Sequence, residues 1–290
     1  MKGKHFIITF FNLKIWQQDK RKQPTSTDEW LSKRFQLFET YCLPSVMMQT
    51  RQDFVWLCLF DEDTPQHYRD RIELLKKSVP QLHDCYYSAS QASQYRDVDE
   101  NTRCRFIRDE IRRRLDTEDE YVITTNLDND DALNIHMIER LHNEIDKQPS
   151  LPMTYRFIYG MQYFTDIHVV LRMRYPHNHF LSLVESTHDD FHTIAYYAHA
   201  KVHRVLPYTD IKGLPGWLEV VHDHNVSNDL RITSRISYHP CLGSCSLKEY
   251  GIDIPLSATN NICKLFIYMP FYFCKVAIWR LKKKIMKKRQ

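Results

Sequence analysis

The chain has 290 residues, of which 43% are hydrophobic, a length and composition that suit one large α/β domain with a sizeable core. The formal net charge is +4, but residues 280–290 hold seven Lys and Arg and no acid, which leaves 33 basic and 36 acidic residues, a net charge of −3, in residues 1–279. The body of the chain therefore lacks the basic excess that nucleic-acid binding requires, and we expect no nucleic-acid partner. The eight cysteines lack paired metal-ligand spacing, which is typical of reduced thiols in a cytoplasmic protein.

Strand and helix patterns alternate along the first half of the chain. Short apolar runs predict strands at residues 6–11, 54–60 and 121–125, and no small-residue cleavage site follows the first run, so we expect a strand there and not a secretion signal. Ser26 and Glu29 form a capping-box pattern before the first predicted helix, and Pro44 is expected to end or kink that helix. Apolar residues three or four positions apart predict helices with buried faces formed by Leu31, Phe35, Phe38 and Cys42, by Cys104, Ile107, Ile111 and Leu115, and by Leu133, Met137, Leu141 and Ile145.

This alternation predicts an α/β fold, in which a mostly parallel sheet carries helices on both faces and ligands gather at the carboxyl ends of the strands. The second half has shorter apolar runs, at residues 169–171, 180–184 and 218–221, and is richer in His and Tyr. Because no repeat or Pro/Gly-rich linker divides the first 260 residues, we expect one domain at residues 1–260 and a tail at residues 261–290.

Three carboxylates, Asp128, Asp130 and Asp131, follow the predicted strand at residues 121–125 within four positions. Carboxylates this close repel one another unless a cation or a proton lies between them, and carboxylate oxygens are the ligands that Mg²⁺ and Mn²⁺ prefer. The alternative is an Asp-rich helix N-cap, where the helix dipole stabilises negative charge. A cap accounts for one or two of these acids, whereas a metal or ligand site accounts for three.

Several blocks of sequence match one family in the same order along the chain. They are Arg34-Phe35, Phe38-Glu39, residues 41–46, Gln49-Thr50, residues 53–57, 61–65, 127–133, 217–222 and 225–228. With these blocks the sequence resembles the bacterial putative rhamnosyltransferase family, which are GT-A type glycosyltransferases with a Rossmann-like fold and an Asp-x-Asp signature. One departure is Asn126, where these proteins often carry an Arg. The resemblance implies a nucleotide-sugar donor bound by residues 1–150, a glycan or lipid-linked glycan acceptor at residues 151–260, and a Mn²⁺ or Mg²⁺ ion.

The resemblance also implies roles for the acidic turn. Asp130 is expected to ligate the metal directly, Asp131 to be a second ligand or a helix cap, and Asp128 to contact the ribose or a metal-bound water. His222, at the end of an apolar run, is expected to be a further metal ligand or diphosphate contact, and His224 is the competing candidate. We expect Asp130→Asn to abolish turnover and leave folding intact, because an acid in an exposed turn contributes little to stability.

The donor and the acceptor need further contacts. The resemblance places the nucleotide at Thr9 and Asp61, although Asp61 can equally cap the following helix, and Arg103 can reach a phosphate if it is not simply solvated. If the transfer inverts the anomeric configuration, as related enzymes generally do, one carboxylate suffices as the base. Glu185, at the end of an apolar run, is the first candidate and Asp190 the next, and the alternative for each is an ordinary surface acid.

Residues 264–279 are apolar and aromatic and precede the basic cluster at residues 280–290. The apolar stretch is shorter than the roughly 20 residues of a spanning helix, and Pro270 and Lys275 interrupt it. We therefore expect a helix in the plane of the interface that holds the protein peripherally on the cytoplasmic face of the cell membrane. The alternative is a final helix packed on the domain.

Two other functions compete with glycosyl transfer. A metal-dependent nucleotidyltransferase or phosphodiesterase would use the same carboxylates but needs a second acidic cluster, for which Asp189 and Asp190 are the only loose candidates. A non-catalytic sugar-binding protein on the same fold would bind the donor without turnover.

Overall fold

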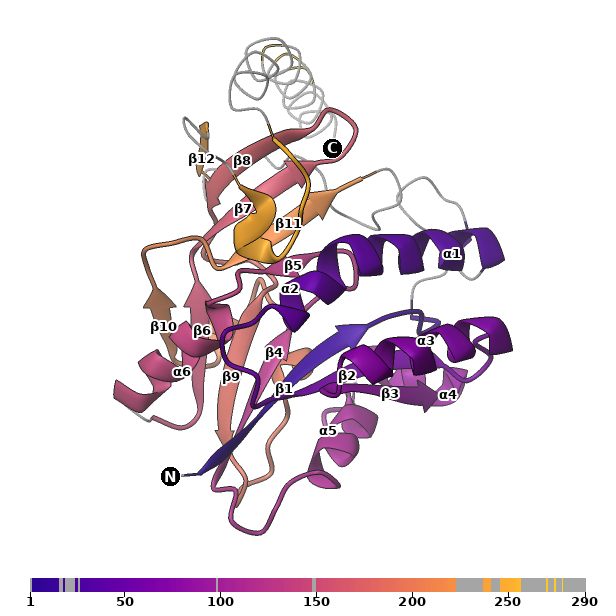
Figure 1. Ribbon diagram of the computed structural model, residues 1–290. Helices are drawn as coiled ribbons and strands as arrows, with labels where there is room; N and C mark the ends of the chain where they lie inside the picture. Colours follow the sequence, from indigo (N-terminus) through magenta and orange to yellow (C-terminus); the bar gives the residue numbers. More distant parts are fainter. Residues whose placement is uncertain are drawn as a thin grey trace, which may run out of the picture.

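The computed structural model describes residues 2–15, 18, 24–25, 27–97, 99–147, 150–222, 237–240 and 246–256, and also residues 270, 274 and 278. Within these ranges two sheets form the centre of the molecule (Figure 1). The main sheet has seven strands in the order β10-β6-β9-β4-β1-β2-β3. They are β1 (Gly3–Phe10), β2 (Val55–Asp61), β3 (Leu82–Tyr87), β4 (Tyr121–Asn126), β6 (Met153–Phe157), β9 (Leu181–Ser186) and β10 (Tyr208–Ile211).

The main sheet is mostly parallel, as the sequence predicts. Among its described strands only β9 runs against its neighbours, β4 and β6, and every other pairing is parallel. The central strands are continuous apolar runs because both of their faces are covered. Ile7 and Trp56 pack on one side, under helices α1, α2, α3 and α6, while Ile8 and Leu57 pack on the other side, under α4 and α5.

The helices are α1 (Asp28–Leu37), α2 (Leu43–Met47), α3 (Gln66–Ser78), α4 (Ala89–Ser93), α5 (Arg105–Arg112) and α6 (Met137–Lys147). The predicted helical faces are buried, except that Leu115 lies beyond the end of α5 and is half-buried. The first helix differs from the prediction at both ends. Its N-cap is Thr27, whose hydroxyl accepts a hydrogen bond from the backbone N–H of Trp30. At the other end a π-helical segment, Phe38–Cys42, joins α1 to α2, and Pro44 lies in the first turn of α2. Helical structure therefore continues to Met47, because proline is tolerated in a first helical turn, where no intrahelical N–H bond is needed.

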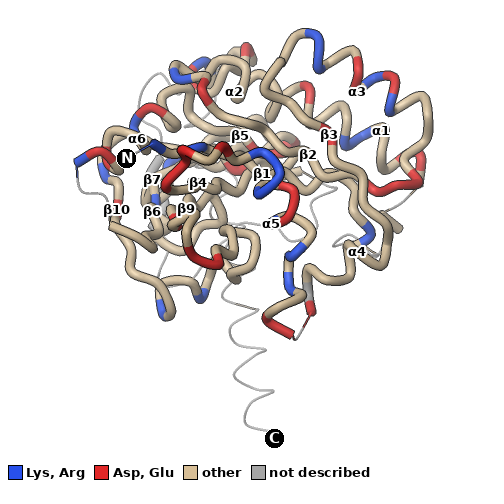
Figure 2. The backbone as a smooth tube through the Cα atoms, turned by 90° about the horizontal axis from the view of Figure 1, so that it is seen from below, with Lys and Arg blue, Asp and Glu red and all other residues tan. Residues whose placement is uncertain are grey.

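Charged residues of both signs alternate along α3, which Figure 2 shows on the outside of the molecule. Arg71 binds Glu39 through two hydrogen bonds of 2.6 and 2.9 Å and so ties α3 to the π-helical segment. The π-helical segment in turn contacts both sheets, since Phe38 packs in the core of the main sheet and Tyr41 in that of the second sheet.

The second sheet was not foreseen from the sequence. Its order is β12-β8-β7-β11-β5, and its strands are β5 (Ala132–Leu133), β7 (Tyr159–Phe164), β8 (Val169–Arg174), β11 (Trp217–Val221) and β12 (Ser237–Pro240). Leu133 therefore lies in a short strand and not in the predicted helix, which begins only at Met137. The acidic turn does not cap a helix, because a strand follows it.

Strands from the second half of the chain complete the main sheet. β9 lies between β4 and β6, so the portions before and after residue 150 share one sheet. A buried polar chain crosses this region: His142 on α6 contacts His5 Nδ1 at 3.1 Å, His5 Nε2 contacts the Thr125 hydroxyl at 2.8 Å, and Thr125 contacts the Ser182 hydroxyl at 2.7 Å.

The predicted membrane-associating tail lies almost wholly outside the described residues. Pro270, Cys274 and Ile278 are helical and exposed. Within the described ranges, no helix combines the length and the apolar character needed to cross a bilayer.

Candidate functional site

The acidic turn runs from the end of β4 to β5, at the carboxyl edge of the main sheet. β5 pairs with β11 in antiparallel register, Leu133 opposite Trp217 and Ala132 opposite Leu218. An antiparallel pair brings residues before one strand close to residues after the other, so His222 at the end of β11 returns to the acidic turn. Asp131 fixes this arrangement, because its Oδ1 accepts a hydrogen bond from the Val220 backbone N–H at 2.8 Å.

Asp130 forms the inner part of the turn. Its Oδ2 lies 2.5 Å from Arg34 Nη1 and 2.9 Å from His222 Nε2, and all three side chains are buried. Arg34 also donates to the Asn129 side-chain oxygen at 3.1 Å. Burial raises the pKa of the Asp130 carboxyl, but Arg34 and His222 outweigh burial and hold this pKa well below its usual range. The expectation of an exposed acid at position 130 is therefore wrong: the residue is a buried, paired carboxylate.

Asp128 and Asp131 meet a third residue, His179, in the outer part of the turn. His179 Nε2 lies 2.8 Å from Asp131 Oδ2 and 3.7 Å from Asp128 Oδ2, and one ligand atom from each residue lies within 4.8 Å of the other two. Asp131 is fully buried, whereas the Asp128 side chain is 44% exposed and gives access from solvent. Two carboxylate oxygens and one imidazole nitrogen are a donor set that suits Mn²⁺ or Mg²⁺, so these residues can hold a divalent metal.

The electrostatics of this triad also fit a bound cation. Burial lowers the pKa of His179, but Asp128 and Asp131 outweigh burial and raise this pKa to about 9. Burial raises the pKa of Asp131 well above its usual value. The contact between His179 Nε2 and Asp131 Oδ2 lies at the position that a cation would take.

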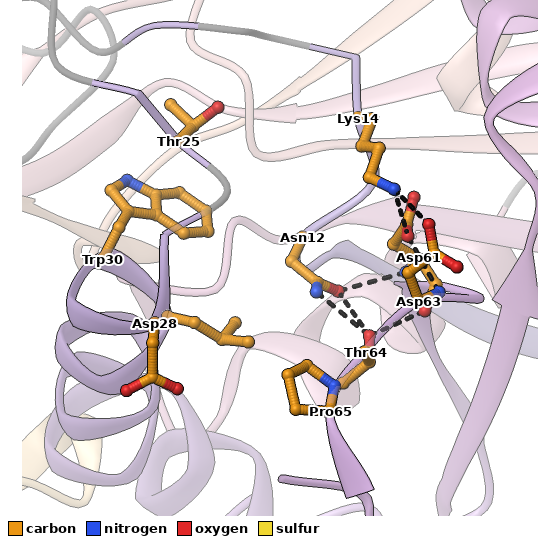
Figure 3. Close-up of a pocket in the computed structure, with 10 residues that line it drawn as sticks. Asn12, Lys14, Thr25, Asp28, Trp30, Asp61, Asp63, Thr64 and Pro65 are labelled. Carbon is orange, nitrogen blue, oxygen red and sulfur yellow. Dashed lines mark hydrogen bonds and ion pairs between the residues drawn. The ribbon is translucent and has the colours of Figure 1, made fainter.

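A second polar site, a cavity of about 180 Å³, lies at the same edge of the sheet, beside the end of β2 (Figure 3). It is lined by residues from segments 12–14, 25–31 and 61–65. Asp61 Oδ1 accepts a hydrogen bond from the Asp63 N–H at 2.9 Å and pairs with Lys14 Nζ at 3.0 Å. Asp61 Oδ2 and Trp30 Nε1 are both buried and have no hydrogen-bond partner among the described residues. Buried polar atoms are rarely left unpaired, so Asp61 Oδ2 is an acceptor ready for a ligand, whereas the Trp30 indole nitrogen points away from Asp61 (Figure 3).

Comparison with known proteins adds a family to this geometry. A model of the family described as "Putative rhamnosyl transferase" matches residues 8–234. The chain belongs to this family. No curated protein matches the sequence.

Solved structures with a similar course of chain include S. aureus TarS and a protein from Desulfovibrio desulfuricans G20 named as a putative nucleotide-diphospho-sugar transferase. TarS is 12% identical with a TM-score of 0.39, covering 76% of this chain and 37% of TarS. TarS 1–349 in complex with UDP is 12% identical with a TM-score of 0.40, covering 76% of this chain and 61% of that one. The D. desulfuricans protein is 8% identical with a TM-score of 0.34, covering 77% of this chain and 83% of that one. This member of the rhamnosyl transferase family thus spans less than two thirds of either TarS chain, and identities and TM-scores this low transfer no function.

Three residues were expected to contact the donor. Asp61 lines the cavity beside β2. It does not cap α3, because no side chain accepts a hydrogen bond at the N-terminus of that helix. Thr9 is fully buried, and its hydroxyl accepts a hydrogen bond of 2.9 Å from the Trp56 indole, which leaves it inside the sheet. Arg103 lies in the turn before α5, at the carboxyl edge, where it donates to the Asp97 carbonyl at 2.7 Å and stacks on the Tyr196 ring.

The two candidate bases lie at the opposite edge of the main sheet. Glu185 pairs with Val122 near the start of β4, and Asp128 lies six positions after Val122, which is roughly 20 Å of extended chain. Both Glu185 oxygens accept backbone hydrogen bonds, from His192 and Thr193, and Asp190 pairs with Arg112 at 2.5 Å. Both residues lie away from the acidic turn because β9 runs antiparallel to β4, so the end of β9 reaches the opposite edge of the sheet.

Two residues of the site were given no role from the sequence. His179 directly precedes the apolar run of β9, and only the reversed direction of that strand places it beside the acidic turn. For Arg34, the sequence itself does indicate a buried charge. It lies three positions after Leu31 and next to Phe35, so it is a charged residue on the buried face of a helix, which requires a buried partner.

Proposed function

We propose that the protein is a metal-assisted glycosyltransferase that moves a sugar from a nucleotide-sugar donor to a glycan or lipid-linked glycan acceptor. Membership of the rhamnosyl transferase family supports the class of reaction and makes rhamnose the first sugar to test. The observation that carries the proposal is the presence, at one edge of the sheet, of a triad able to hold a cation and a separate cavity with unpaired buried polar atoms. A nucleoside diphosphate needs both kinds of site.

The cavity beside β2 is proposed to hold the base. Asp61 Oδ2 can accept a hydrogen bond from an N–H of a base such as uracil or thymine, and Trp30 lies on the opposite side of the cavity (Figure 3). Asp61 is held in place by Lys14 and by the Asp63 N–H, and its free oxygen is therefore fixed before the ligand arrives.

Asp128, Asp131 and His179 are proposed to hold the cation, Mn²⁺ or Mg²⁺. A bound cation would neutralise the charge that develops on the leaving diphosphate. Asp130 takes a supporting part: it is engaged with Arg34 and His222, and it holds the C-terminal end of β11 against the turn. We propose that the transfer inverts the anomeric configuration, which needs one general base and no covalent intermediate on the protein.

The competing phosphodiesterase function has less support. Within the described ranges only one group of three or more His, Cys, Asp or Glu side chains is close enough to share an ion. Asp190, proposed from the sequence as part of a second cluster, lies at the other edge of the sheet and is paired with arginine.

We also propose that the tail at residues 261–290 holds the protein on the cytoplasmic face of the cell membrane. The support is its sequence, an aromatic stretch followed by seven basic residues. A lipid-linked acceptor would then lie at the same surface as the enzyme.

The test is calorimetric binding of dTDP-rhamnose, UDP-sugars and GDP-sugars, each with Mn²⁺ and again with EDTA. We expect one donor to bind in a metal-dependent way. Asp61→Asn removes the charge but keeps an oxygen, and should weaken that binding about tenfold, the lower end of the range for a hydrogen bond to a charged group. Asp70→Asn, an exposed change on α3, is the matched control. If no donor binds under either condition, or if Asp61→Asn binds like the wild type, the proposed function or the proposed base site is wrong.

A further inference from the structure

A second cavity, of about 440 Å³, lies at the β10 edge of the main sheet. Its lining includes two arginines, Arg156 and Arg174, two histidines, His177 and His203, and Tyr208 and Asp210 from β10. These side chains come from β6 and β10, at the left of Figure 1, from the end of β8, from the loop before β9 and, for His203, from the 3-10 helix Val202–Arg204. We call this cavity the arginine pocket.

Arg156 is a buried charge with one edge engaged. Its Nε and Nη2 lie 2.8 and 2.6 Å from Asp210 Oδ1, and its guanidinium stacks on the Tyr208 ring at 3.6 Å. No described residue accepts a hydrogen bond from Nη1. The carboxylate and the ring therefore fix the plane of the guanidinium while leaving it donor capacity, which is the preorganised state that oxyanion recognition uses.

Arg174 supplies charge that no described residue balances. It ends β8, its side chain is exposed, and it makes no ion pair or side-chain hydrogen bond with the described part of the chain. The pocket thus has two guanidinium groups against one carboxylate. The rings of His177 and His203 lie 4.3 Å apart beside them.

The register places the arginine pocket close to the acidic turn. Arg156 pairs with Leu181 on β9, and Thr125, near the end of β4, pairs with the next residue of β9, Ser182. β6 is separated from β4 by β9 alone, so Arg156 lies about 10 Å from the end of β4. His177 precedes the proposed metal ligand His179 by two residues, a span of at most about 7 Å. The base cavity lies on the other side of β4, beside β2.

We propose that the arginine pocket binds a phosphate group, as a monoester or diester, carried by the acceptor. The inference rests on the proposed function, since it places an anionic acceptor on the side of the metal triad away from the base of the donor. A planar guanidinium group can donate two parallel hydrogen bonds to two oxygens of one phosphate. A pocket with two guanidinium groups and a net positive charge therefore favours a phosphate monoester, with three free oxygens, or a diester, with two. The acceptor is thus an anionic glycan, not a neutral one.

The experiment uses the full chain with EDTA and no nucleotide, so that neither the metal triad nor the donor contributes. Inorganic phosphate and glycerol 3-phosphate are titrated by calorimetry, with glycerol as the uncharged comparison. We expect both phosphates to bind, glycerol not to bind, and Arg174→Gln to weaken phosphate binding at least tenfold. Lys77→Gln removes one exposed positive charge from α3 and should leave binding unchanged. Arg174 is chosen because its substitution breaks no contact with the described residues, whereas a change at Arg156 would unpair Asp210.

The outcomes separate this inference from the proposed function. Absence of phosphate binding, equal binding in Arg174→Gln, or equal weakening in Lys77→Gln would overturn it. Complete displacement of phosphate by the nucleotide alone would also overturn it, because the phosphate would then occupy the donor site. Phosphate binding should persist in Asp61→Asn, so loss of nucleotide binding alone leaves the pocket standing. If the protein sediments with phosphatidylglycerol vesicles and Arg174→Gln weakens this sedimentation, the phosphate group belongs to a lipid headgroup. If the protein binds soluble phosphate but does not sediment with the vesicles, the phosphate group belongs to a polymer.

Discussion

Asp130→Asn tests the pairing of Asp130 with Arg34. The substitution removes one charge of a buried pair whose side chains are 7% and 5% exposed, and it leaves the Arg34 guanidinium buried. Breaking a buried ion pair by removing one partner costs about 3–5 kcal/mol. The lower end applies here, because Arg34 keeps its hydrogen bond to Asn129 and the new amide oxygen can still accept one. A loss of about 3 kcal/mol corresponds to a fall in Tm of roughly 6 °C for a chain of this size.

The assay is chemical denaturation with EDTA present, so that metal binding does not contribute. Asp128→Asn is the matched control: its side chain is 44% exposed, and we expect its free energy of unfolding to stay within about 0.5 kcal/mol of the wild type. Both variants should lose turnover, but only Asp130→Asn should lose stability. An Asp130→Asn protein that unfolds with the wild-type free energy would refute the buried pair and restore the exposed acid that the sequence suggested.

Three further outcomes can be checked. Burial lowers the pKa of His142 to about 4, below the value of 6.5 in the unfolded chain. Between these two pKa values the unfolded state binds more protons, so the free energy of unfolding should fall by up to about 1.4 kcal/mol per pH unit as pH falls from 6.5 to 4. The free energy of unfolding of His142→Gln, measured by denaturation, should depend less steeply on pH. His179→Ala should lower Mn²⁺ affinity at least about tenfold in a calorimetric titration, and unchanged affinity would remove His179 from the triad. Gly160→Ala would push a Cβ into the Trp217 ring and should cost about 1–3 kcal/mol on thermal unfolding.

The sequence predicted the parallel core of the fold well, because that core is built from local signals. The strands that became β1, β2 and β4 are continuous apolar runs, and the stripes on α1 and α5 match their buried faces. The second sheet was missed because β5 has only two residues, too few to show a period.

The placement of some candidate site residues also follows from local signals. The acidic turn and His222 do meet, since they flank two local apolar runs, and Asp61 lines a cavity. The positions of Glu185, Asp190 and His179 relative to the acidic turn depend on the direction of β9. A run of apolar residues does not indicate whether its strand is parallel or antiparallel to its neighbours, so the sequence could not predict these positions. Asp130 was misjudged because its exposure is set by Arg34, which lies 96 positions away in sequence.

The position of β9 has a consequence for how the protein is made. Until residues 181–186 are available, β4 is an edge strand with unpaired backbone groups, and edges of this kind invite wrong pairing. Residues 1–150 alone would lack this strand and also His179. A nascent chain can therefore bring the proposed cation ligands together only after β9 has joined the sheet.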